Sequence, residues 1–252
     1  MKTAEKLFTI CSSWEQAVAI SIGYQDSRLV ENLTSNLRLN PPWLDFKLQI
    51  LNTRIMELMA TIQYVLKNNK KCEIRVADVG GGNGYMGVAI SKLFPEIKWE
   101  WIVYESTEIA EAYSSVLNQS NVISFAPTPE LFKTSVGSIR KLPDIILISG
   151  TLQYIEYPYA LLQKLLGVPV PKIVMRIPFQ STENDIVTVQ DFEKIGGYAG
   201  LNAVSWPMWW FSRPKFIQFI KQSSTIDFQW VTDSESYRFM GNDIALEGLV
   251  CH

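Results

Sequence analysis

Short apolar runs alternate along the chain, from Cys72 onward, with segments whose apolar residues recur at helical spacing. The apolar runs predict strands at 73–80, 97–105, 121–127, 143–150, 171–179, 225–234 and 244–251. The periodic segments predict helices at 85–94, 107–117, 129–142, 157–167 and 214–223. This order of elements is typical of a doubly wound α/β sheet, here with seven strands.

Two stretches depart from the alternation. Residues 1–70 predict a helical N-terminal cap, which precedes a sheet domain at 71–252. Within this cap, Asn40–Trp43 ("NPPW") is interpreted as the entry turn of a long helix. The second stretch, at about 178–212, is too long for an ordinary connection of about two to six residues. We expect it to be a loop that serves as a lid over a substrate.

The composition is that of a globular protein and narrows the range of functions. Of 252 residues, 47% are hydrophobic, and a formal net charge of -2 without long basic runs argues against a nucleic-acid partner. The three cysteines are far apart, so we expect reduced thiols and no metal site. No apolar run approaches the roughly 18 residues of a membrane span, so we expect a cytoplasmic protein. His252 is the single histidine, and an internal histidine base is therefore excluded.

The turn that follows the first strand of the predicted sheet is rich in glycine. It reads "VADVGGGNGYMG" over Val76–Gly87, and its part from Gly82 to Gly87 formally matches the GxGxxG dinucleotide fingerprint. Asp78 precedes these glycines, and a carboxylate there would repel a pyrophosphate but suit a ligand with a positive end. A tight turn without a ligand is the structural alternative.

The spacing Asp-x-Gly-x-Gly-x-Gly resembles the cofactor loop of class I methyltransferases, which bind S-adenosylmethionine. The resemblance implies a Rossmann-like fold, in which Asp78 orients the loop and the ammonium side of the cofactor. It also implies that Glu105, at the end of the next strand, binds the ribose hydroxyls. An NAD site places an acid on a ribose at a similar distance, so Glu105 alone does not discriminate. The implied cofactor-binding residues are Asp78, Gly80, Gly82, Asn83, Gly84, Glu105, Ser149 and Gln153.

A more specific resemblance covers nearly the whole chain. It is carried, in order, by "SSWEQA" with Gly23-Tyr24, "PDIILISGTLQYIEYPYALLQKLL", "RIPF" with "TVQ", and "SWPMWWFS" before "KFIQFI". These segments are similar to a largely uncharacterised bacterial family that is classed as methyltransferases and is often associated with surface-polysaccharide gene sets. Met175 and Ile177 stand where that family usually has an acid and a threonine, so the substrate of relatives does not transfer to this chain.

Ligands bind at the carboxyl ends of strands in such sheets, which brings Tyr154 and Arg176 to the reaction zone. We expect Tyr154 to position or deprotonate an acceptor and Arg176 to hold an acidic group of the substrate. Indole and phenol rings stack on sugars or aromatic rings, so the candidate substrate-binding residues are Tyr24, Trp206, Trp209 and Trp210. The alternative is that these residues have structural roles: packing for the aromatic side chains and an ion pair for Arg176.

The leading hypothesis is a methyltransferase that uses S-adenosylmethionine to methylate an oxygen or nitrogen of a small molecule, such as a sugar or polysaccharide precursor. An NAD(P)-dependent oxidoreductase is the first alternative, which Asp78 and the lack of a Tyr-x-x-x-Lys pair disfavour. A catalytically inactive cofactor-binding subunit is the second. The expected partner is a small-molecule acceptor, neither nucleic acid nor membrane, and a homodimer stays open.

Overall fold

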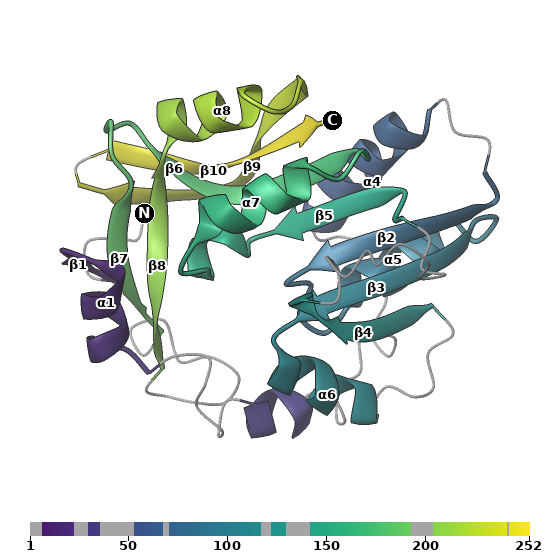
Figure 1. Cartoon of the computed structure of the whole chain (residues 1–252), viewed down its shortest axis with the longest axis horizontal. Coiled ribbons are helices and arrows are strands. Elements are labelled where there is room, and N and C mark those ends of the chain that lie inside the picture. Colours follow the sequence, from purple (N-terminus) through teal and green to yellow (C-terminus); the bar gives the residue numbers. More distant parts are fainter. Residues whose placement is uncertain are drawn as a thin grey trace.

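Seven of the described strands form a central sheet in the order β4-β3-β2-β5-β6-β10-β9 (Figure 1). The computed structural model describes residues 7–22, 30–35, 53–67, 71–116, 122–129, 142–192, 204–240 and 242–252. The seven strands are β2 (Glu73–Val79), β3 (Lys98–Glu105), β4 (Ile123–Pro127), β5 (Ile145–Ser149), β6 (Lys172–Gln180), β9 (Ile226–Phe239) and β10 (Asn242–Cys251). Strands β2 to β6 run parallel, and β10 pairs antiparallel with both β6 and β9. The predicted doubly wound sheet is confirmed.

Helices cover both faces of this sheet (Figure 1). On one face, α4 (Thr53–Leu66) and α5 (Tyr85–Leu93) pack over apolar side chains of β2, β3 and β6. On the other face, α7 (Pro158–Leu166) and α8 (Arg213–Lys221) pack over apolar side chains of β2, β5 and β6. The helix α6 (Thr107–Val116) lies against β4 on the face of α4 and α5, since Tyr113 packs on Phe125, which borders the cluster beneath those two helices. The four predicted helices that correspond to α5 to α8 are confirmed, whereas the fifth, at 129–142, lies outside the described residues apart from its ends. Among the described helices, none is long and apolar enough to span a membrane.

An antiparallel sheet continues from the carboxyl end of β6. Its middle strand, β7 (Ile186–Asp191), pairs with β8 (Ser205–Ser212) and β1 (Phe8–Cys11), and β8 meets β6 where Phe179 pairs with Phe211. The expectation of a loop over 178–212 is therefore wrong for its described part, while 193–203 lies outside the described residues. The reason is that β8 is buried on both faces, with Trp206, Met208 and Trp210 on one and Phe211 on the other, so its sequence lacks the alternation of apolar and polar residues that indicates a strand.

The N-terminal segment is helical only in part. The helix α1 (Trp14–Ile20) begins after Ser13, whose hydroxyl accepts a hydrogen bond from the Gln16 amide. Residues 8–11, which were expected to be helical, instead form β1, because their backbone groups pair with β7 from far along the chain. Local helical spacing carries no information about such a partner. The predicted entry turn at Asn40–Trp43 lies outside the described residues.

We predict that Gly87→Ala lowers the free energy of unfolding by about 1–3 kcal/mol, because a close-packed interior resists an added methyl group. A Cβ at Gly87 of α5 would stand 2.6 Å from Cγ of Trp101 on β3. Gly167→Ala is the matched control, since a Cβ there would lie 3.4 Å from the Lys164 carbonyl, and its effect should stay within about 0.5 kcal/mol. Chemical denaturation measures both, and equal stability of the two variants would contradict the packing of α5 on β3.

Candidate functional site

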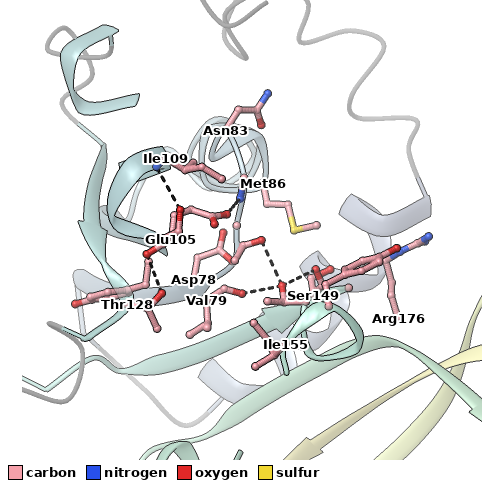
Figure 2. A pocket seen from close by; sticks show the side chains of 18 of the residues that line it. Asp78, Val79, Asn83, Met86, Glu105, Ile109, Thr128, Ser149, Ile155 and Arg176 are labelled. Carbon is pink, nitrogen blue, oxygen red and sulfur yellow. Dashed lines mark hydrogen bonds between the residues drawn. The ribbon is translucent and has the colours of Figure 1, made fainter. Parts of the chain in front are cut away.

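A cavity of about 610 Å³ lies at the carboxyl ends of β2, β3, β5 and β6. Parallel strands end at one edge of a sheet, so residues far apart in the sequence meet there. The predicted site residues that line it are Asp78, Gly80, Gly82, Asn83, Glu105, Ser149, Gln153, Tyr154, Arg176 and Trp206. Figure 2 shows Glu105 and Arg176 at opposite ends of this group, with Asp78 and Ser149 between them. The cavity therefore has an acidic end and a basic end.

The glycine loop between β2 and α5 takes backbone conformations that suit glycine. At Gly80 and Gly82, φ is +69° and +58°. A Cβ at Gly80 would overlap the side chain of Thr151, whose hydroxyl donates to the Val79 carbonyl at 3.0 Å. A Cβ at Gly82 would meet no atom within 4 Å, so the backbone at this position is open to a ligand. Gly84, which was predicted to bind the cofactor, is the N-cap residue of α5 and does not line the cavity.

Asp78 is a fully buried carboxylate at the head of the loop. Its Oδ2 accepts a hydrogen bond of 2.9 Å from the indole Nε1 of Trp101, while its Oδ1 has no hydrogen-bond partner among the described residues. Burial raises the pKa of the Asp78 carboxyl to about 7, against the Trp101 hydrogen bond that lowers it. A buried oxygen without a donor costs stability, so a cationic ligand would complete this site.

Glu105 faces the loop from the end of β3. Its Oε1 accepts a hydrogen bond from the Gly82 amide at 2.8 Å, and its backbone carbonyl accepts one from the Thr128 hydroxyl (Figure 2). Burial raises the pKa of the Glu105 carboxyl above its ordinary value, and the amides of Gly82 and Ser106 oppose that shift. One carboxylate oxygen therefore fixes the loop, and the same group lines the cavity.

Tyr154 belongs to a short 3-10 helix, η3 (Leu152–Tyr154), that follows β5. Its hydroxyl donates to Oε1 of Gln190 at 2.8 Å, and its ring packs edge to face on Trp206 at 5.8 Å between centroids. Because the phenolic proton is donated to the Gln190 amide, the oxygen is oriented to accept a hydrogen bond from a ligand. This geometry fits positioning of an acceptor, the first of the two roles expected for Tyr154.

The clustered tryptophans of β8 separate into different environments. Trp206 lines the cavity, whereas Trp209 and Trp210 do not. Trp209 stacks on Trp14 with ring centroids 5.5 Å apart and donates to the Ile155 carbonyl. Trp210 stacks on Phe239 at 4.5 Å. The structure therefore gives Trp209 and Trp210 packing contacts in place of the predicted position in the substrate site, and Tyr24 lies outside the described residues.

Arg176 lines the cavity from a strained position in β6. All nine residues of this strand are buried, and φ at Arg176 is +61°. A left-handed backbone costs a non-glycine residue about 1–2 kcal/mol. Nε2 of Gln153 donates to the Arg176 carbonyl at 3.5 Å, which helps to hold this conformation. Strain of this kind is concentrated at functional sites, so the position agrees with the expected role of Arg176 in ligand binding.

Several residues of the site have no counterpart in the sequence-based prediction. Arg54 of α4 and Tyr85 of α5 both line the cavity. Burial raises the pKa of the Tyr85 phenol, while Arg54 and Arg176 oppose this shift, so both guanidinium groups lie near that hydroxyl. The apolar residues at helical spacing around Arg54 predict which side of this helix is buried, but they do not indicate that Arg54 itself lines a cavity. Trp101 was assigned only to a strand, although its indole holds Asp78.

Comparison with known proteins identifies a fold and no sequence family. No protein-family model matches the sequence, and no curated protein does. The crystal structure of the 4+2 cyclase SpnF matches with 10% identity and a TM-score of 0.54, over 97% of this chain and 97% of that chain. An S-adenosylmethionine-dependent methyltransferase from Clostridium acetobutylicum ATCC 824 matches with 11% identity and a TM-score of 0.48, over 79% and 92%.

A third structure, magnesium protoporphyrin IX methyltransferase from Synechocystis PCC 6803 with bound S-adenosylmethionine, matches with 11% identity and a TM-score of 0.46, over 88% of this chain and 96% of that chain. The strand order, with an antiparallel β10 between β6 and β9, and the match to SpnF show a Rossmann-like fold of the class I methyltransferase type. A fold hosts many reactions, so the chemistry has to be argued from the cavity.

We predict that Asp78→Asn stabilises the ligand-free protein at pH 8 by about 2 kcal/mol, because it removes a buried charge and keeps an acceptor for Trp101. The folded-state pKa is raised from 3.8 to about 7, so the folded state binds more protons than the unfolded state between these values. The wild type should therefore lose stability as the pH rises from about 4 to 7, relative to the variant. Urea denaturation at pH 5 and pH 8 measures the difference. The exposed Glu183→Gln is the control, and a pH-independent effect of Asp78→Asn would contradict the burial of its charge.

Proposed function

We propose that the protein is an S-adenosylmethionine-dependent methyltransferase that acts on an oxygen or nitrogen atom of a small molecule. The observation that carries the proposal is the buried Oδ1 of Asp78, which lies at the head of the glycine loop without a donor among the described residues. A buried carboxylate oxygen without a donor costs stability, so a cationic or hydrogen-bond-donating group of a ligand would stabilise it. The ammonium of S-adenosylmethionine is a group of this kind.

The other charged groups of the cavity fit the remaining parts of this cofactor. Glu105 suits the ribose hydroxyls, since a carboxylate accepts hydrogen bonds from two neighbouring hydroxyl groups. Arg54 suits the cofactor carboxylate, because a guanidinium binds a carboxylate by paired hydrogen bonds. A dinucleotide would instead bring a doubly charged pyrophosphate close to Asp78 and Glu105. The arrangement therefore supports a sulfonium cofactor over NAD(P).

The aromatic part of the cavity lining suits a small acceptor that carries a ring. Tyr154, Phe192 and Trp206 contribute this aromatic surface. S-adenosylmethionine, when bound, supplies an activated methyl group. The residues of the chain would hold the acceptor in line with that group and exclude water, which provides much of the rate enhancement of a displacement reaction. Tyr154 would receive a hydrogen bond from the acceptor, and a sugar or polysaccharide precursor is one ring compound of suitable size.

Two other functions make different predictions for the same site. An oxidoreductase requires binding of NADH or NADPH. A catalytically inactive subunit requires cofactor binding without formation of S-adenosylhomocysteine from any acceptor pool. The match in fold to a 4+2 cyclase shows that proteins of this architecture are not all described as methyltransferases, so product formation has to be measured directly.

We predict that S-adenosylhomocysteine binds to the protein in isothermal titration calorimetry and that Glu105→Gln weakens this binding by about 10–100-fold. Glutamine keeps an oxygen for the Gly82 amide but loses the charge that strengthens hydrogen bonds to the ribose. Glu100→Gln, which alters a carboxylate of the same strand that pairs with Arg75, is the matched control and should bind normally. Binding of NADH in place of S-adenosylhomocysteine would refute the proposal.

The affinity for S-adenosylhomocysteine should also depend on pH through Asp78. Protonated Asp78 cannot pair with the ligand ammonium, and burial places its pKa at about 7. We therefore expect the dissociation constant to rise by up to about tenfold per pH unit below this value and to level off above it. Calorimetry from pH 5.5 to pH 8.5 provides the measurement. The same slope in Asp78→Asn would assign the effect to another group.

A further inference from the structure

The strain at Arg176 arises from a β-bulge between β6 and β10. On β10, Glu247 lies opposite Ile177 and Leu249 lies opposite Val174, so the two residues 175 and 176 face the single residue 248. One residue of β6 is thus supernumerary in the pairing, and Arg176 is the one with a left-handed backbone. Bulges of this kind occur next to active sites, where they redirect a side chain.

The two apolar clusters of the core show what the bulge changes. Val174 belongs to the cluster under α7 and α8, and Met175 belongs to the cluster under α4 and α5. In a regular strand, residue 176 would share the face of Val174 and residue 177 that of Met175. Ile177 instead joins the cluster of Val174. The bulge thus keeps an arginine out of the apolar layer beneath α7 and α8 and leaves it on the cavity wall.

The surroundings of Arg176 are those of a site for a polar ligand. The side-chain oxygens Oγ of Ser149 and Oε1 of Gln153 are buried, line the cavity and have no hydrogen-bond partner among the described residues. Gln153 is only 6% exposed, and its Nε2 is already used to hold the Arg176 carbonyl. Tyr154, which follows Gln153 in the chain, and Trp206, whose ring contacts that of Tyr154, also line the cavity. A ligand with both an anionic group and a hydrogen-bond donor would satisfy these groups together.

Two guanidinium groups, those of Arg54 and Arg176, line a cavity to which S-adenosylmethionine would bring one carboxylate. We infer that Arg176, presented by the bulge, selects a methyl acceptor that carries an oxyanion, either a carboxylate or a phosphate, next to a ring. This inference rests on the proposed function and names the substrate class of the same site. Gln153 Oε1 would accept a hydrogen bond from the hydroxyl or amino group of that acceptor.

The test uses the whole protein saturated with S-adenosylhomocysteine and three probes with the same ring. Benzoate and phenyl phosphate carry an oxyanion, and benzamide is the neutral counterpart of benzoate. We expect benzoate or phenyl phosphate at millimolar concentration to raise the unfolding temperature, since a ligand that binds only the folded state stabilises it. The larger of these two responses identifies the oxyanion, and benzamide should give none. An equal response to benzamide, or no response to either anion, would overturn the inference.

The variant Arg176→Gly separates a role in binding from a role in the fold. Glycine adopts the left-handed backbone without strain, so we expect an unfolding temperature at or above that of the wild type together with loss of the response to the anions. Arg176→Lys keeps a charge and should keep part of the response. Met240→Gly is the matched control, since Met240 is the other described non-glycine residue with positive φ (51°) and lies outside the cavity.

The outcomes also separate this inference from the proposed function. If Arg176→Gly binds S-adenosylhomocysteine as tightly as the wild type but no longer responds to the anions, the inference holds. If it loses affinity for S-adenosylhomocysteine, Arg176 holds the cofactor, and the inference falls while the proposed function stands. If the wild type itself does not bind S-adenosylhomocysteine, the proposed function fails, whatever the anions do.

Discussion

The hydrogen bond from the Trp101 indole to the Asp78 carboxylate is the interaction on which the cofactor end of the cavity depends. It holds a fully buried carboxyl group in place at the point where β2 turns into the glycine loop. The absence of a side chain at Gly87 gives the indole its room, and a Cβ at Gly81 would collide with the carboxylate itself. The loop, the helix α5 and the strand β3 thus all pack around the carboxylate of Asp78. Its second oxygen, Oδ1, has no hydrogen-bond donor among the described residues, and a ligand could supply one.

The parallel part of the sheet was predictable because each strand is a short apolar run followed by a segment with helical periodicity. Asp78, Glu105, Ser149 and Arg176 could be assigned to one edge of the sheet because each lies at or near the end of such a run. Strand β8 was not predicted, since Pro207 and the clustered tryptophans suggested a loop. Residues on both of its faces are buried, so apolar and polar residues do not alternate along it. Strand β1 was not predicted either, because it pairs with β7, which lies far along the chain.

Other features of the site depend on contacts that no local pattern contains. The bulge at Arg176 exists only through the pairing of β6 with β10. The division of the tryptophans follows from their places along β8. Trp206 and Trp210 share a face of the strand, but Trp206, near its start, lines the cavity, and Trp210, near its end, packs against Phe239. The sheet order gives the fold, but a structure with this fold is described as a cyclase, so the distribution of charge in the cavity carries the functional argument.

If a cationic cofactor completes the site of Asp78, binding of its ammonium has to change the titration of this carboxyl group. Carbon-13 NMR of labelled aspartate carboxyl groups, titrated with and without saturating S-adenosylhomocysteine, measures that change. We expect Asp78 to titrate with a pKa near 7 in the free protein and bound ligand to lower this pKa by at least about one unit, because a nearby ammonium favours the charged carboxylate. A pKa of Asp78 that stays unchanged or rises when the ligand binds would refute the pairing of Asp78 with the cofactor.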